Sequence, residues 1–171
     1  MSIKAIHVLS AVTLCLAVAL PVAVGGGPPA DKATGDVMGT PAAHPFRWYY
    51  LDFSAHEGET LLQGKGEVTL LRLDVDAQTV IREEHCEVLY VKVEGHSAWF
   101  AGPILYDSAN VLPLRWIVVY VEDGGQPGAG NDALWWTRVA DASEALEMVE
   151  QETLPATDVV VQAGNLTVHT R

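Results

Sequence analysis

The segment at residues 123–132 carries the side chains of this chain that are best suited to binding a metal ion. Oxygen-bearing residues stand at both ends of this glycine-rich stretch: Glu122, Asp123, Asn131 and Asp132. Calcium prefers oxygen ligands of this kind, although the spacing does not follow the EF-hand pattern. A long hairpin loop explains the same residues, because its glycines adopt positive φ and its acids accept backbone hydrogen bonds. The sequence is compatible with either interpretation, a calcium site or a structural loop.

The aromatic residues form a second set, which suits a small apolar or aromatic ligand. The chain has five tryptophans and five tyrosines. Adjacent Trp135 and Trp136 must point to opposite faces of a regular strand, so one of them lies outside the main core. Core packing is the alternative for most of the set. The residues expected at a ligand surface are Trp48, Tyr50, Trp99, Trp116, Trp135 and Trp136.

No group of residues in the sequence identifies a reaction. Residues 95–99 begin like a nucleophile elbow, but Trp99 stands where glycine is needed, and two strands flank the segment. A hairpin turn is expected there instead. The histidines after the N-terminal segment show no zinc-binding spacing, and neighbouring carboxylates arise freely among 22 acids. We therefore assign no catalytic residue, and a small hydrolase is the least favoured function.

The N-terminus has the features of a signal peptide. Lys4 precedes an apolar run at residues 8–20, and Ala23 and Gly25 are small residues at the two positions that signal peptidase reads. We expect cleavage after Gly25, a flexible spacer at residues 26–32 and one domain at residues 33–171. The processed chain is expected to have no stable membrane span. The predicted location is therefore secreted or periplasmic.

Charge and cysteine content restrict the partners and the chemistry. The formal net charge is −12, and loss of residues 1–25 leaves 9 basic and 22 acidic residues, a net charge of −13. Such a surface disfavours binding to nucleic acid and to anionic membranes. Cys86 is the only cysteine left after cleavage, so no disulfide forms within the chain. A packed thiol is expected at Cys86.

Strand and turn signals dominate the chain after the leader. Asp141 and Glu144 form a capping box for one short helix, which ends before Pro155. Several strands have apolar residues on both faces, so one face builds the core and the helix covers part of the other. The pattern predicts seven or eight strands in an antiparallel barrel or sandwich. The clearest strands are residues 46–55, 64–73, 87–93, 98–106, 115–122, 134–139 and 165–169.

Short motifs dominated by turn residues occur along most of the chain, at residues 33–35, 46–55, 64–66, 90–93, 101–102, 121–128 and 164–166. They resemble a loosely defined group of small secreted bacterial β-domain proteins of uncharacterised function. The resemblance implies an exported β-domain and transfers no catalytic residue. Together with the residues above, it favours a non-catalytic exported binding or envelope-associated domain. A lipocalin-like carrier of a small apolar or aromatic ligand is the alternative.

Overall fold

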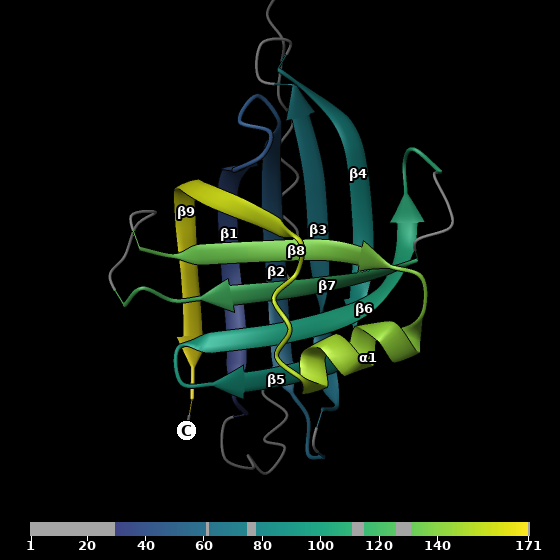
Figure 1. Ribbon diagram of the computed structural model, residues 1–171, viewed down its shortest axis with the longest axis vertical. Helices are drawn as coiled ribbons and strands as arrows, with labels where there is room; N and C mark the ends of the chain where they lie inside the picture. Colours follow the sequence, from purple (N-terminus) through teal and green to yellow (C-terminus); the bar gives the residue numbers. More distant parts are fainter. Residues whose placement is uncertain (1–29, 61, 75–77, 111–114, 126–130, 171) are drawn as a thin grey trace, which may run out of the picture.

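The domain is an eight-stranded antiparallel barrel with one additional strand and one helix. The computed structural model describes residues 30–60, 62–74, 78–110, 115–125 and 131–170. Figure 1 shows β1 to β4 running roughly across β5 to β8, with β9 bending from one layer into the other. The elements in chain order are β1 (Lys32–Pro41), β2 (Trp48–Glu57), β3 (Gly64–Asp74), β4 (Thr79–Val88), β5 (Tyr90–Glu94), β6 (Ser97–Asp107), β7 (Trp116–Glu122), β8 (Ala133–Val139), α1 (Ala142–Glu150) and β9 (Thr157–His169).

Pairing between β4 and β6 closes the barrel. The sheet order is β4-β3-β2-β1-β9-β8-β7-β6-β5, and a short ladder joins β4, at one end of this order, to β6, the last strand but one at the other end. The additional strand β5 pairs with the first half of β6, where Val91 is fully buried in the interior cluster. A Cβ atom added to Gly64 would lie only 2.2 Å from a Val91 methyl group, so glycine permits this close approach. Strand β5 therefore helps to close one end of the barrel.

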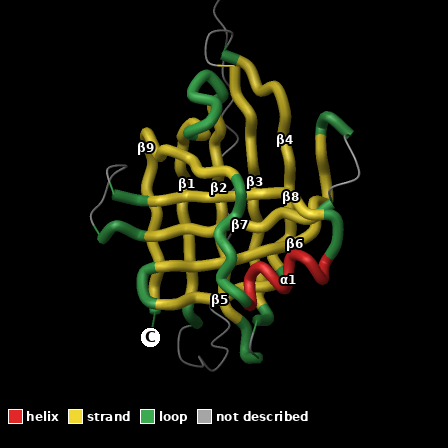
Figure 2. The backbone as a smooth tube through the Cα atoms, in the orientation of Figure 1, coloured by secondary structure: helices red, strands yellow, loops and turns green. Residues whose placement is uncertain are grey.

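Two hydrophobic clusters lie on opposite faces of the curved sheet. The interior cluster contains the inward residues of the barrel, and Phe53 stacks on Phe100 with their ring centroids 5.1 Å apart. The outer cluster lies where α1 packs against β5, β6 and β7, and it buries Ala145 and Val149 of the helix. Figure 2 shows this helix as the one red segment beside the sheet. The helix thus covers the second apolar face, as the sequence predicts.

The predicted all-β fold with one helix is confirmed, and the choice between barrel and sandwich falls on the barrel. The hairpin of β7 and β8 and the Asp141 N-cap are also confirmed, since the Asp141 carboxylate accepts the N–H groups of Ser143 and Glu144. Glu144 reaches back to the backbone N–H of Ala140 rather than that of Asp141. The predicted signal peptide and most of the spacer lie outside the described residues. In the described part of the chain, no helix is long and apolar enough to cross a membrane.

Several strands differ from their predicted extents. The single strand predicted at residues 87–93 is wrong, because this stretch contains the end of β4, which begins at Thr79, and most of β5. Strand β1 is not predicted, since Gly35, Gly39 and Pro41 are typical of turns. Strand β9 runs for 13 residues straight through Gly164, where a turn is expected. Gly164 has φ +110°, and a Cβ atom there would meet the Asp36 carbonyl oxygen at 2.0 Å. Gly164 therefore allows β9 to bend closely around β1 instead of ending the strand.

Candidate functional site: an arginine-rich barrel mouth

On three strands, the alternate residues that face the barrel interior form a row, and each row ends in an arginine at the same end of the barrel. On β3 and β8 an apolar row ends in Arg72 and in Arg138, and on β4 the row from Val88 through Cys86 ends in Glu84 and Arg82. The loop before β2 adds Arg47. We call this end of the barrel the mouth and define it by Arg47, Tyr49, Arg72, Arg82, Glu84, Asp107, Trp136 and Arg138. It holds four of the six arginines of the chain.

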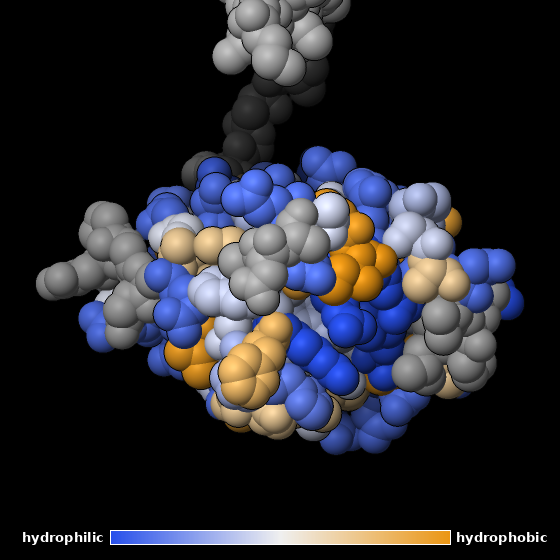
Figure 3. All heavy atoms as spheres, turned by 90° about the horizontal axis from the view of Figure 1, so that it is seen from above, coloured by the Kyte–Doolittle hydropathy of each residue, from blue (hydrophilic) through white to orange (hydrophobic). Residues whose placement is uncertain are grey.

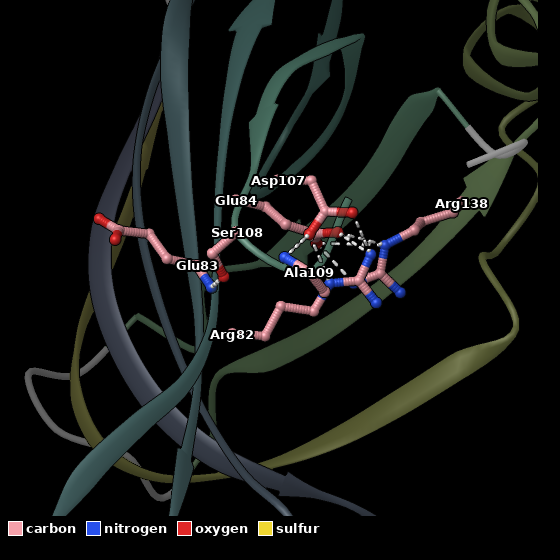
Figure 4. A network of polar contacts seen from close by, with 7 residues as sticks. All are labelled: Arg82, Glu83, Glu84, Asp107, Ser108, Ala109 and Arg138. Atoms are coloured by element: carbon pink, nitrogen blue, oxygen red, sulfur yellow. Dashed lines mark hydrogen bonds and ion pairs between the residues drawn. The ribbon is translucent and has the colours of Figure 1, made fainter. Parts of the chain in front are cut away.

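Glu84 is the centre of an ion-pair network at the mouth. Its side chain is only 1% exposed. Arg138 donates from Nε at 2.9 Å and from Nη2 at 2.5 Å to its two carboxylate oxygens, and Arg82 Nη2 lies 2.7 Å from Oε1. Arg82 also donates through Nε and Nη2 to Asp107 at 2.9 and 2.8 Å. Figure 4 shows both guanidinium groups facing these two carboxylates. The four charges balance one another, which satisfies the buried carboxylate.

Electrostatic effects on Arg82 agree with this geometry. Burial alone lowers the pKa of a guanidinium, but the hydrogen bond to Asp107 and the charge of Glu84 outweigh it, so the pKa of Arg82 is raised. Arg82 therefore stays charged and holds β4 to β6 near their short ladder. The network is a structural support for the mouth. Neither Glu84 nor Asp107 is left as a base, because both accept charge-assisted hydrogen bonds.

Two hydrogen-bond donors at the mouth are buried and have no partner among the described residues. They are Nε of Arg72 and Nε1 of Trp136. Arg72 lies directly opposite Arg82 in the β3–β4 register and opposite Tyr49 in the β2–β3 register. Trp136 packs edge-on against Tyr49 at 5.3 Å and carries the Arg138 guanidinium 4.7 Å above its ring. A buried donor without an acceptor costs about 1–3 kcal/mol, so the mouth is suited to a group that brings acceptors.

Two pockets open at this end, and Arg47 lines both. The mouth pocket, of about 470 Å³, is lined by Pro41, Ala42, Ala43, His44, Arg47, Tyr49, Trp136, Arg138, Ala156, Thr157 and Asp158. The rim pocket, of about 400 Å³, is lined by Pro45, Phe46, Arg47, Trp48, Arg72, Leu73, Asp74 and Ile81. Figure 3 looks onto this end and shows strongly hydrophilic residues beside hydrophobic ones. Both volumes lie in the range typical of small-molecule sites.

The six aromatic residues expected to form a ligand surface lie in different places. Trp136 faces the interior and the mouth pocket, and Trp48 lines the rim pocket. Tyr50 alternates with inward Tyr49 and Leu51, so it faces outward. The other three belong to the outer cluster beside α1, with Tyr90 stacked on one and Tyr120 tilted against the other two: Trp116, Trp99 and Trp135. Only Trp48 and Trp136 therefore line the mouth or rim pocket, and the six do not line one common interior.

The acids predicted to bind calcium make local hydrogen bonds. Asp123 accepts the backbone N–H groups of Gly125 at 2.7 Å and Val168 at 3.1 Å. Asp132 accepts the N–H of Gly124 at 3.1 Å, and its other oxygen is buried without a partner. These contacts match the structural-loop interpretation, in which the acids satisfy backbone amides.

The remaining ligands of the predicted calcium site give it no further support. The Glu122 carboxylate accepts the Tyr120 hydroxyl at 3.0 Å, and Asn131 is exposed. Residues 126–130 of the loop lie outside the described part of the chain. Among the residues that are described, no three His, Cys, Asp or Glu side chains converge on a point where a metal ion would bind. We therefore base no function on this loop.

One arrangement outside the mouth has the connectivity of a hydrolytic triad. On the outer face of β3 and β4, His85 Nδ1 lies 3.2 Å from Thr69 Oγ1, and His85 Nε2 lies 2.8 Å from Glu83 Oε1. His85 and Glu83 are almost half exposed. The backbone around them takes part in the β3–β4 ladder, which leaves no pair of N–H groups aimed at a developing oxyanion. The geometry fits an ordinary surface cross-strand contact better than catalysis.

Cys86 is a buried thiol in the barrel interior, as the sequence predicts. Its side chain belongs to the interior cluster, 3% exposed. Burial, with a smaller contribution from the charge of Glu84, raises the pKa of this thiol to about 12. Cys86 is therefore uncharged at neutral pH and unsuited to nucleophilic attack.

Sequence reasoning missed the arginines of the mouth, although a signal for them was present. In LLQGKGEVTLLRL and in ALWWTRV, an alternating apolar row continues into an arginine at the next inward position. An inward-facing charge at the end of a strand marks a barrel end. Comparison with protein-family models, with curated proteins and with solved structures finds no match to this chain. The site must therefore be interpreted from its own geometry.

Proposed function

We propose that this chain is an exported, non-catalytic binding protein whose barrel mouth holds a small ligand bearing a carboxylate or a similar anionic group. The observation that carries the proposal is that two buried donors at one end of the barrel have no partner among the described residues. Arg72 Nε belongs to a residue of the rim pocket and Trp136 Nε1 to a residue of the mouth pocket. Both are donors, so an acceptor-rich group complements them. The signal-peptide features of the N-terminus support export.

The hydrogen-bond donors at the mouth, rather than its net charge, favour an anionic ligand over a neutral one. The two buried acids, Glu84 and Asp107, are already paired with Arg82 and Arg138. Arg47 and Arg72 add further positive charge, while Asp158 and Asp74 lie on the pocket walls. The four arginines offset these four acids, so this end is less negative than a chain of net charge −12 has on average. Arginine also presents a planar fork that matches a carboxylate.

Binding at the mouth is favoured over carriage deep inside the barrel. The middle of the barrel is filled by apolar side chains, among them Phe53 stacked on Phe100, and Val91 lies in the same cluster. A ligand can therefore bind at the mouth, but the filled interior beyond the mouth has little space for it. This position distinguishes the proposal from a lipocalin-like carrier, whose ligand enters the barrel. An envelope-associated role remains compatible with binding at the mouth.

Indole N–H resonances offer a direct test of the proposal. Uniformly ¹⁵N-labelled protein is titrated with acetate, benzoate and inorganic phosphate, and with benzamide as the neutral counterpart of benzoate. We expect at least one anion to move the Trp136 indole resonance downfield as its N–H gains an acceptor, and benzamide to bind more weakly than benzoate. Trp99 is the internal control, because its indole N–H is also buried without a partner but lies in the outer cluster.

Substitution at Arg72 completes this test. Arg72→Gln is expected to weaken anion binding about tenfold or more, since a hydrogen bond to a charged group contributes about 1.5–3 kcal/mol. Lys65→Gln removes one positive charge from the other end of the same strand and is the matched control. The proposal is wrong if no anion moves the Trp136 resonance, or if the two substitutions weaken binding equally.

A further inference from the structure

We infer that the ligand of this site is amphiphilic, with its carboxylate at the mouth arginines and an apolar chain or ring in the rim pocket. The inference rests on the proposed function and adds the chemical class of the ligand. The rim pocket joins Arg47 and Arg72 to apolar side chains from three segments: Phe46, Trp48, Leu73 and Ile81. Two guanidinium groups and four apolar side chains therefore line one pocket, together with Asp74.

The backbone explains why charge and apolar surface meet at this pocket. Trp48 and Leu73 are register partners on β2 and β3 and stand side by side. The β3–β4 register shifts between Arg72 and Leu73, at the rim of the barrel. Arg72 belongs to the inward row, yet it lines the same pocket as outward Leu73 and Trp48. The rim pocket thus runs from the interior side of the barrel wall to its outer side.

Exposed apolar side chains at the rim also need an explanation. Phe46 is 94% exposed and Ile81 is 50% exposed, and both line the rim pocket. Val80, which precedes Ile81, is exposed to a similar extent. Exposed apolar side chains that lie together beside cationic groups fit a surface that contacts a ligand. An alkyl chain or an aromatic ring attached to a carboxylate covers this surface while the carboxylate reaches Arg72.

Three probes that separate the two parts of the ligand test the inference. Octanoate carries both a carboxylate and an apolar chain, acetate carries the carboxylate with a single methyl group, and octyl glucoside carries the chain on an uncharged sugar. We expect octanoate to bind about tenfold or more tightly than acetate, because burying two methylene groups already gives that factor. Octanoate should move the indole resonances of both Trp48 and Trp136, whereas acetate should move that of Trp136 alone.

A pair of exposed residues gives matched variants for the apolar part. Ile81→Ser is expected to weaken octanoate binding about threefold to tenfold and to leave acetate binding unchanged. Leu154→Ser is the control, since Leu154 is 53% exposed and does not line the pocket. Equal affinity for octanoate and acetate would overturn the inference and leave the proposed anion site standing. Failure of all anions to bind would overturn both, and tighter binding of octyl glucoside than of octanoate would show an apolar site without a carboxylate requirement.

Discussion

Arg138 on β8 clasps the carboxylate of Glu84 on β4, a residue 54 positions earlier in the chain, with Nε at 2.9 Å from Oε1 and Nη2 at 2.5 Å from Oε2. In the barrel order, β8 and β4 are separated by β7 and β6. The pair therefore spans the mouth from one wall to another. Because the Glu84 side chain is buried, this contact ties the geometry of the proposed binding site to the stability of the fold.

Glu84→Gln should lower the free energy of unfolding by about 3–5 kcal/mol, since it leaves Arg82 and Arg138 without their buried carboxylate. Urea denaturation measures the change. The adjacent Glu83→Gln is the control, because Glu83 is about two-fifths exposed and its carboxylate points away from the network (Figure 4). We expect Glu83→Gln to stay within about 0.5 kcal/mol of the parent. Equal losses for the two variants would mean that the network has no special role.

Arg72→Met should raise the free energy of unfolding by about 0.5–2 kcal/mol while it weakens ligand binding. The substitution removes a buried donor that lacks an acceptor, and it removes a cation placed opposite Arg82 in the β3–β4 register. Residues kept for binding commonly reduce stability in this way. Urea denaturation without ligand gives the test, with Lys65→Met as the control on the same strand. A loss of stability in Arg72→Met would assign this arginine to the structural framework instead.

The Cys86 thiol should make stability depend on pH in alkaline solution. Its pKa is raised by burial to about 12 in the folded chain, whereas an unfolded thiol ionises near pH 8.5–9. Between about pH 9 and 12 only the unfolded chain loses this proton, so the free energy of unfolding falls as pH rises. Cys86→Ala should remove that part of the slope. An identical slope in parent and variant, measured by urea denaturation at several pH values, would contradict the assignment.

Val149→Ala should destabilise the domain by roughly 1–3 kcal/mol, because Val149 is fully buried where α1 covers the outer cluster. The emission of the outer tryptophans should change with it, since Trp99 and Trp135 belong to the same cluster. Glu147→Ala, at an exposed position of the same helix, is the control. If Val149→Ala leaves both stability and emission unchanged, the helix is not needed to cover this face.

Asp123→Ala should lower stability by about 0.5–1.5 kcal/mol, because it removes an exposed hydrogen bond to the N–H of Gly125 and a part-buried one to the N–H of Val168. The loss should be the same with added calcium and with a chelator, since the carboxylate serves the backbone. Thermal unfolding of parent and variant under both conditions measures this. A melting temperature of the parent that rises with calcium and falls with chelator, with no such response in Asp123→Ala, would restore the metal hypothesis for the loop.

The sequence alone determined that this chain forms a strand-rich domain with one capped helix and a buried, unreactive Cys86. Those features depend on local signals: alternating apolar residues, turn residues, and an N-cap at Asp141. Opposite faces for Trp135 and Trp136 followed from the period of a strand alone, and the structure places them in different clusters.

Only the tertiary structure decided where the functional chemistry lies. The β4–β6 ladder closes the barrel, and closure brings Arg72, Arg82 and Arg138 from three separate strands to one end. The sequence does not show that these arginines lie close together, because strand register and strand order are set by long-range pairing. The same pairing moves Trp99 and Trp116 away from the interior, beside α1. Which face of a strand becomes the inside of a barrel depends on the whole sheet, and the residues of one strand cannot specify it.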